Sequence, residues 1–310
     1  MDHKIYLTDP GIFKKGSKFY YHKNSRKVVE PQILERIGKI YTPPAWKNVW
    51  YSSNKKCHVL AHGIDNNGKK QYILSDNWIN NSRYEKYNRM KMFMRDIKNF
   101  KRVIKLESFN YSKETLIKLL FNLMLDLHIR VGNEIYASTN GSYGLTTLRQ
   151  RHLINHYQFK FIGKSNKLHV IKIPECYNNF LKHYKKNNSD RPLFVYKENN
   201  VKKVVSSDDL NDYLKQNMGK EYTCKDFRTY SANILFIKAF LKNSRNEKPS
   251  KKIILKSIDS TAQQLGHSRN ISRKSYISNN LLDYCYDYFD SASGMSPDVL
   301  ATKVWESDSC

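Results

Sequence analysis

The pattern of apolar and polar residues changes near residue 82. Before it, short apolar runs separated by turn signals predict a small, mainly β domain over residues 1–82. The clearest pair, residues 57–64 and 69–74, flanks Asp65-Asn-Asn-Gly68, and Asn-Gly supplies the positive φ angles of a hairpin turn. Upstream, Pro43-Pro44 prevents a helix and keeps the backbone extended. The polar run over residues 77–81 indicates a linker.

From residue 83 the apolar period becomes helical. Ser112 is placed to cap a helix, and a hairpin over residues 158–173 puts Lys164 at its tip. Residues 208–218 predict another helix, and an apolar one starts near Lys225. The fold class is therefore α+β, with a second, mainly α domain over residues 83–310 that contains a β-hairpin. The buried face of the first helix is Leu116, Leu120, Leu123 and Leu127.

Residues 265–277 concentrate candidate chemistry. A helix capped by Ser260, with Gln263 at the reciprocal capping position, would stop at Gly266, so that His267 emerges just past its end. Tyr276 would lie near the start of the next apolar helix. A tyrosine hydroxyl among fixed cations can act as a nucleophile, and a phosphate is the group that such cations hold. The alternative is a surface turn with an ordinary tyrosine, since the chain contains 22 of them. The neighbouring cations are Arg269, Arg273 and Lys274.

Charge narrows the choice of partner. The 310 residues contain 54 Lys and Arg against 28 Asp and Glu, a formal net charge of +26. Such an excess predicts a polyanion, with nucleic acid ahead of a membrane, although a basic surface kept for solubility is the alternative. No window reaches the roughly 20 apolar residues of a membrane span, so no membrane partner is expected. Basic residues are spread along the chain, which suits a folded protein that wraps its partner.

The cysteines and the N-terminus indicate the compartment. The five cysteines are scattered and never form a C-x-x-C pair, which argues against a disulfide framework and a zinc site. They are typical of reduced thiols in an intracellular, non-secreted protein, and the N-terminus lacks the apolar run of a signal peptide. No carboxylate cluster or phosphate-binding lysine loop calls for a metal or a nucleotide. We therefore expect no cofactor.

Four further residues have an ordinary structural explanation when each is taken alone. Arg130 could close a helix, Lys164 could be a solvated turn residue, and Arg228 could pair with Asp226. His267 could be a structural histidine. Together with Tyr276 they form an ordered set of Arg, hairpin Lys, Arg, Gly-His and Tyr in a very basic protein, which these separate explanations account for poorly.

Seven motifs in this order resemble a known family, over nearly the whole chain. They are Pro43-Pro-Ala-Trp46, Gly68-Lys-Lys-Gln-Tyr72, Arg130-Val-Gly-Asn-Glu-Ile-Tyr136, Gly144-Leu-Thr-Thr-Leu148, Phe161-Ile-Gly-Lys164, Lys225-Asp-Phe-Arg-Thr-Tyr230 and Leu265-Gly-His267 through Tyr276. The set is similar to the small type IB DNA topoisomerases of poxviruses, giant viruses and bacteria. The resemblance implies that residues 83–310 have the catalytic fold shared with tyrosine recombinases, and that residues 1–82 contact DNA.

The resemblance also implies roles. Tyr276 would attack a DNA phosphodiester and form a 3′-phosphotyrosyl link, while Arg130, Arg228 and His267 hold the phosphoryl oxygens. Lys164, helped by Arg130, would protonate the departing 5′-oxygen, and religation would need no ATP. The enzyme would relax supercoils as a monomer clamped around double-stranded DNA, in the cytoplasm at a replication site or in the virion if it is viral. Duplex contacts would come from Gln71, Tyr72, Tyr136 and Lys225, with Arg269, Arg273 and Lys274 as backbone contacts.

Two departures and two alternatives remain open. Asn133 and Ser165 differ from common family residues, which puts the 5′-CCCTT preference of the poxvirus enzymes in doubt. A tyrosine recombinase or integrase shares the chemistry. Its usual His-x-x-Arg box is replaced here by the Lys-Asp-Phe-Arg sequence ending at Arg228, and a β domain precedes the catalytic region. A DNA-binding protein without catalysis would lack one of the five positions, and none is lacking.

Overall fold

The computed structural model describes residues 6, 8–155, 157–184, 187–244, 250–287 and 300. The chain forms two compact units, Met1–Lys86 and Tyr87–Cys310. The division falls inside helix α3 (Asp76–Val103), after residue 86, where the sequence predicted one after residue 82.

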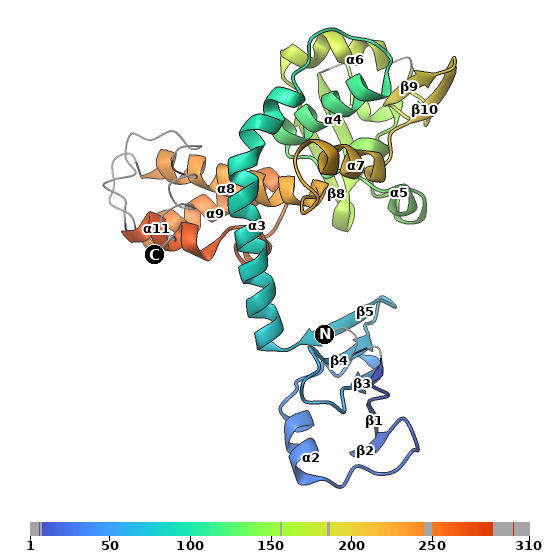
Figure 1. Cartoon of the computed structure of the whole chain (residues 1–310), viewed down its shortest axis with the longest axis vertical. Coiled ribbons are helices and arrows are strands. Elements are labelled where there is room, and N and C mark those ends of the chain that lie inside the picture. Colours follow the sequence, from blue (N-terminus) through green and yellow to red (C-terminus); the bar gives the residue numbers. More distant parts are fainter. Residues whose placement is uncertain are drawn as a thin grey trace. The chain divides into compact units, whose positions relative to one another are not determined.

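The first unit is built on a five-stranded antiparallel sheet in the order β2-β1-β3-β4-β5 (Figure 1). The predicted hairpin is confirmed: Asp65 accepts the amide of Gly68 at 3.0 Å, and Gly68 has a φ of 72°. Helix α2 (Pro31–Gly38), which the sequence pattern did not reveal, starts at a proline and buries Ile37 against the sheet. The strands are β1 (Ile12–Lys15), β2 (Lys18–Tyr21), β3 (Lys47–Tyr51), β4 (Val59–Ile64) and β5 (Lys70–Leu74).

The predicted linker over residues 77–81 is wrong, because these residues form the first turns of α3. Trp78 stacks on His58 of the first unit at 4.3 Å, which fixes this end of the helix. The asparagines that suggested a linker lie on the exposed side of the helix. A helix can carry polar residues there when an apolar stripe elsewhere holds it in place. That stripe is Met90, Phe93, Met94, Ile97 and Phe100.

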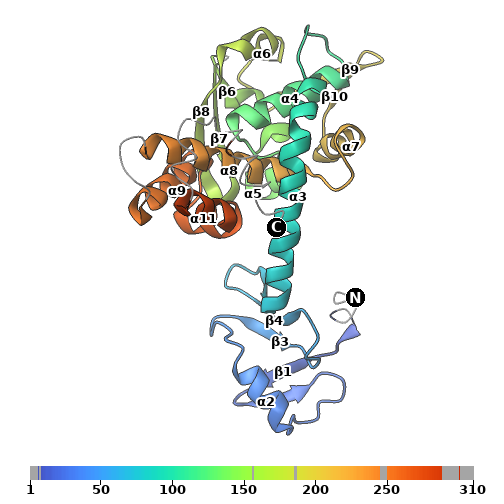
Figure 2. The same cartoon turned by 60° about the vertical axis from the view of Figure 1, so that its left-hand side comes forward.

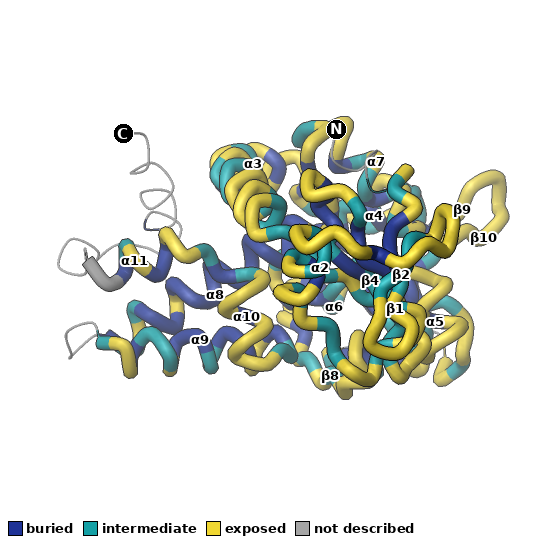
Figure 3. The backbone as a smooth tube through the Cα atoms, turned by 90° about the horizontal axis from the view of Figure 1, so that it is seen from below, coloured by how far each residue is buried: buried dark blue, intermediate teal, exposed yellow. Residues whose placement is uncertain are grey.

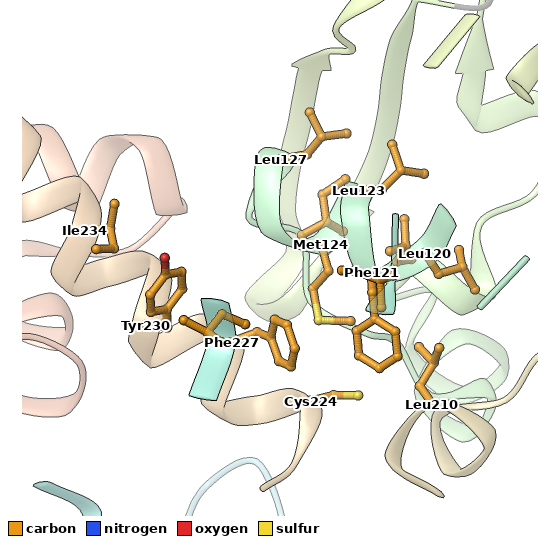
Figure 4. Packing of buried hydrophobic residues seen from close by; sticks show 14 of the residues in the cluster. Leu120, Phe121, Leu123, Met124, Leu127, Leu210, Cys224, Phe227, Tyr230 and Ile234 are labelled. Atoms are coloured by element: carbon orange, nitrogen blue, oxygen red, sulfur yellow. The ribbon is translucent and has the colours of Figure 1, made fainter. Parts of the chain in front are cut away.

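The core of the second unit lies where α4 (Lys113–Leu127) meets α8 (Cys224–Asn243). The predicted cap is confirmed, since the Ser112 side chain accepts the amide of Thr115 at 3.1 Å. Phe121 of α4 and Phe227 of α8 have ring centroids 5.3 Å apart, and Figure 4 shows them facing each other across the cluster. Helix α8 is buried along much of its length (Figure 3), so a side chain placed on it is rigidly held.

Smaller elements surround this core. The predicted hairpin at residues 158–173 is confirmed as β7 (Gln158–Gly163) and β8 (Lys167–Lys172), and β6 (Leu153–Ile154) extends it to three strands. A second hairpin, β9 (Val195–Glu198) with β10 (Val201–Val204), has no predicted counterpart. The predicted helix at 208–218 is α7 (Ser207–Asn217). The other short elements are α5 (Glu134–Asn140), α6 (Asn178–Tyr184) and the 3₁₀ turns Leu145–Thr147, Gln150–His152, Lys164–Asn166 and Glu175–Tyr177.

The last described helices are α9 (Lys251–Leu265), α10 (Arg269–Ser275) and α11 (Asn279–Asp287). Helix α9 packs beside α8 in both Figure 1 and Figure 2. The predicted Ser260 cap is wrong: α9 is capped ten residues earlier, by Ser250, and Ser260 donates to the carbonyl of Lys256 inside the helix. The predicted stop is confirmed, because Gly266 adopts the left-handed conformation at φ 64°.

Candidate active site

Arg130 lies in the segment that leaves helix α4. Its carbonyl accepts the amide of Leu145 at 2.8 Å, which ties the segment to the turn after Gly144. Gly132 and Gly144 meet backbone to backbone, since a Cβ on Gly144 would lie 2.5 Å from the Cα of Gly132. Gly132 also has a φ of 97°, which side chains rarely adopt. These two glycines therefore explain the motifs around them: they set the path of the backbone that presents Arg130.

Arg228 is buried on α8, with 8% of its surface exposed. Its guanidinium donates to the carbonyls of His128 and Leu265, at the C-terminal ends of α4 and α9. It does not pair with Asp226. The carboxylate of Asp226 instead forms an ion pair with Arg89 at 3.1 Å and accepts the backbone amide of Thr223. Burial, with the nearby charge of Arg130, lowers the pKa of Arg228 to about 9. Among the described residues, the hydrogen-bond acceptors of this guanidinium are thus neutral groups, and an anion would stabilise its charge.

His267 joins the two arginines. Its Nε2 lies 2.6 Å from Nη2 of Arg130 and 3.1 Å from Nη2 of Arg228. A guanidinium has donors only, so Nε2 is the acceptor and the ring proton resides on Nδ1. Burial, reinforced by the charges of both arginines, Lys167 and Lys164, lowers the pKa of His267 to about 3. Nδ1 of His267 and Nε of Arg228 are buried without a hydrogen-bond partner among the described residues. The site therefore gathers N–H groups, which favour an anion.

Tyr276 stacks on His267, with ring centroids 4.6 Å apart and planes at 15°. The sequence predicted Tyr276 near the start of the next helix, whereas in the structure it is the C-cap residue of α10. Asn233 of α8, fully buried, fixes this segment: its amide donates to the carbonyl of Tyr276 and accepts from the amide of Ser278, both at 3.1 Å. The chain between His267 and Tyr276 forms α10, which is capped by Ser268.

Lys164 lies at the exposed tip of the β7–β8 hairpin, as predicted. Lys164 and the two arginines line one small cavity. Leu265, which precedes Gly266 and His267 in the sequence, lines it as well. The five predicted catalytic residues thus come from four separate parts of the second unit and converge on one place.

The remaining predicted contacts are distributed differently. Gln71 and Tyr72 lie on β5 of the first unit, where Gln71 donates to Asp65 at 2.7 Å. Tyr136 on α5 is 61% exposed, and Lys225 is exposed in the first turn of α8. Arg269 forms an ion pair with Asp259. Arg273 and Lys274 are exposed on α10.

Two residues at the site were missed by sequence reasoning. His169 on β8 lines the cavity, and Asn233 holds the Tyr276 backbone. Neither lies in a motif with a local signal, because each acts through contacts distant in sequence. Asn233, an amide in the middle of an apolar helix, was the one detectable anomaly, since a buried polar group needs a partner.

Other expectations concern metals, membranes and thiols. Among the described residues, no group of three or more His, Cys, Asp or Glu side chains is placed to hold a metal ion. No helix in the described ranges has the length and apolarity needed to cross a bilayer. Cys57, Cys176, Cys224 and Cys285 are free thiols, and Cys310 lies outside the described residues.

Comparison with known proteins identifies the family of the chain. The family model of the eukaryotic DNA topoisomerase I catalytic core matches residues 75–286, and that of the bacterial DNA topoisomerase IB N-terminal domain matches residues 18–65. DNA topoisomerase 1B of Acanthamoeba polyphaga mimivirus is 37% identical over 292 residues, which cover 88% of this chain and 87% of the viral protein. DNA topoisomerase I of Monkeypox virus and DNA topoisomerase 1B of Vaccinia virus (strain Copenhagen) are each 26% identical over 252 residues, 74% of this chain and 73% of theirs.

The matches to both parts of the chain define a topoisomerase I-type protein, with an N-terminal sheet and a largely helical catalytic region. Within that class, the chain belongs to the type IB DNA topoisomerase family.

Proposed function

We propose that the chain relaxes supercoiled double-stranded DNA by cutting one strand and resealing it, with Tyr276 as the nucleophile. The observation that carries the proposal is the convergence of Arg130, Arg228 and His267, with His267 stacked on Tyr276. The Tyr276 oxygen attacks a backbone phosphorus and loses its proton to water. The bond from phosphorus to the 5′-oxygen breaks, which leaves a 3′-phosphotyrosyl link and a free 5′-hydroxyl.

The two arginines and His267 stabilise the charge that builds on the phosphoryl oxygens. Guanidinium forks suit a phosphate, and groups fixed before the reaction need no rearrangement of solvent. An entering phosphate takes the arginine donors that His267 Nε2 now accepts. His267, carrying its proton on Nε2 in that complex, then donates to a phosphoryl oxygen as well. The phosphate-binding groups are therefore gathered before DNA binds, and Nε2 of His267 occupies the place that a phosphoryl oxygen takes in the complex.

Lys164 gives a proton to the departing 5′-oxygen and takes it back during religation. An exposed lysine on a hairpin tip can reach the leaving group from outside the helical core. Arg130, which lines the same cavity, assists it. The phosphotyrosyl bond replaces one phosphodiester with another of similar energy, so resealing requires no ATP.

Supporting features extend the proposal to the whole complex. The net charge of +26 suits a protein that surrounds a duplex. We place DNA contacts on Gln71, Tyr72, Tyr136, Lys225, Arg273 and Lys274, and on Arg269 once it leaves Asp259. The enzyme would act as a monomer clamped around one duplex, inside the cell or, if viral, at a cytoplasmic replication site or in the virion. Its catalytic region would share the tyrosine recombinase fold; the relatives compared above are named topoisomerases, which favours relaxation over recombination.

Plasmid relaxation tests the activity. Purified protein should relax negatively and positively supercoiled plasmid at low salt, in EDTA and without ATP. Positive supercoils distinguish this activity from enzymes that act only on underwound DNA. Tyr276→Phe, purified in parallel, controls for contaminating nucleases and topoisomerases. Failure to relax either sign, or equal relaxation by the variant, would contradict the proposal.

A further inference from the structure

We propose that His169 is a positioning residue: its ring sets the spacing between the hairpin that carries Lys164 and the helix end that carries His267. The proposal rests on the function given above for Lys164. His169 belongs to none of the motifs that identify the family in this sequence, so its role has to be argued from its contacts alone.

The ring of His169 lies against two glycine backbones. A Cβ on Gly163 would come within 2.7 Å of His169 Cδ2, and a Cβ on Gly266 would come within 2.9 Å of Cε1. Both distances are too short for a side chain, so the ring fills the space next to each Cα. One flat ring is therefore in contact with two segments that are more than 100 residues apart in sequence.

These two glycines are the immediate neighbours of catalytic residues. Gly163 precedes Lys164 at the end of β7, and Gly266 precedes His267 at the end of α9. The same ring lines the cavity with Arg130, Lys164 and Arg228. A change in the thickness of this spacer moves the Lys164 hairpin relative to the phosphate-binding groups.

The ring itself is held firmly and is uncharged. It is half-buried and stacks on Phe161 with centroids 5.1 Å apart and planes at 15°. Burial, with Arg228, Arg130 and Lys167 nearby, lowers the pKa of His169, so the neutral ring prevails at physiological pH. Its shape is the property that the site uses, and phenylalanine supplies a similar flat ring.

Removal of the ring should affect the hairpin more than the phosphate clamp. His267 keeps its contacts to Arg130 and Arg228 and its stack on Tyr276 without His169. The hairpin tip is held less firmly, because Lys164 is exposed and the turn passes through Ser165 and Asn166 at φ 64° and 56°. His169→Ala should therefore impair proton donation by Lys164 and spare nucleophilic attack.

A leaving-group substitution separates these two steps. Single-turnover cleavage is measured at a site mapped on a random duplex library, with either oxygen or sulfur at the 5′-bridging position. Sulfur departs without a proton. His169→Ala should slow cleavage of the oxygen substrate by about 10- to 100-fold, part of the ~10²–10⁴ that a general acid supplies, and that of the sulfur substrate by less than about threefold. His169→Phe should stay within about threefold of wild type on both substrates.

Two controls decide how a failure is interpreted. Val170→Ala removes the exposed neighbour on the same strand and should change neither rate. Lys164→Ala tests the acid itself: if sulfur rescues Lys164→Ala but not His169→Ala, the positioning role is wrong and the proposed function stands. If sulfur rescues neither variant, both the acid role of Lys164 and the positioning role are wrong. Loss of activity in His169→Phe would mean that the imidazole nitrogens, and not the ring shape, are needed.

A double-mutant comparison tests the contact directly. Gly163→Ala should lower the melting temperature of the otherwise wild-type protein, since its Cβ collides with the ring. In the His169→Ala background the same change should cost little, because the colliding ring is gone. Additive effects of the two changes would show that the residues are not in contact, and would overturn the proposal.

Discussion

His267 is the residue at which the charges of the site meet. Its Nε2 accepts from two guanidinium groups, so the neutral ring with its proton on Nδ1 is the form that fits the DNA-free protein. A positive imidazolium there would face two arginines without an anion. The low pKa of about 3 is thus a consequence of the same packing that gathers phosphate-binding groups.

The protonation of His267 can be measured. In DNA-free protein, ¹H–¹⁵N correlation spectra of the His267 ring should show the Nδ1–H form between pH 5 and 8, roughly a range in which an ordinary histidine with a pKa near 6.5 titrates. The signal should begin to shift only toward pH 3, where the lowered pKa lies. A midpoint near the ordinary value would mean that the two arginines do not contact the ring in solution.

At the scale of single residues, the sequence identified the candidate catalytic residues but not the contacts that surround them. Arg130, Lys164, Arg228, His267 and Tyr276 could be named because each lies in a short motif. The contacts of His169 with Gly163 and Gly266 could not be foreseen, because they join strands and helix ends that only the folded chain brings together. For the same reason, the pairing of Asp226 with Arg89, and not with Arg228, was not predictable.

Helix ends do much of the positioning at the scale of elements. The left-handed residue His128 after α4 and the last residue of α9, Leu265, both direct carbonyls at Arg228. Carbonyls at helix C-termini carry partial negative charge, which favours a buried cation. The close backbone contact between Gly132 and Gly144 then holds the segment after α4 against the 3₁₀ turn Leu145–Thr147, which fixes the position of Arg130.

Gly144→Ala tests this arrangement. Its φ of −145° suits any residue, so the cost comes from packing alone: the new Cβ would lie 2.5 Å from backbone atoms of Gly132 and 2.7 Å from the carbonyl of Arg130. Backbone on both sides must move, and displacement of Arg130 should reduce cleavage by about a hundredfold. Gly38→Ala is the matched control, since nothing lies within 4 Å of its Cβ. Normal cleavage by Gly144→Ala, measured in single turnover, would show that the approach is dispensable.

Elements with a strong local signal were predictable and others were not. The hairpins at residues 57–74 and 158–173, the helix after Ser112 and the stop at Gly266 followed from turns and caps. The start of helix α3 was wrongly predicted as a linker, because its polar first turns are stabilised by Trp78 against His58, a contact that leaves no pattern in the sequence. The start of α9 was predicted wrongly, because Ser250 and Ser260 are both acceptable caps and only packing against α8 decides between them.

At the scale of the whole molecule, charge governs the encounter with DNA. The excess of 26 positive charges is spread along the sequence, and both units contain exposed lysines. A cation that contacts a phosphate releases condensed counterions, so binding weakens as salt rises. Composition alone predicts such a partner, whereas the division after residue 86 depends on contacts that form only in the folded chain.

The salt dependence of binding gives the size of the contact. With Tyr276→Phe, which cannot react, the logarithm of the affinity for duplex DNA should fall linearly with the logarithm of salt, with a slope of about −0.9 per phosphate contact. An interface of roughly 6–10 contacts would lose about 10³–10⁵ in affinity between roughly 50 and 200 mM salt. Fluorescence anisotropy measures the slope. A nearly flat dependence would contradict a protein that surrounds the duplex.

The most direct measurement of the central claim is the chemical identity of the covalent adduct. Wild-type protein is mixed with duplex DNA, quenched in SDS and digested, and the protein–DNA link is located by mass spectrometry. The account predicts a single adduct, a phosphodiester between Tyr276 and a DNA 3′-end, with a free 5′-hydroxyl on the other fragment and no adduct in Tyr276→Phe. An adduct on another residue, a link to a 5′-phosphate, or an SDS-stable complex in the variant would contradict it.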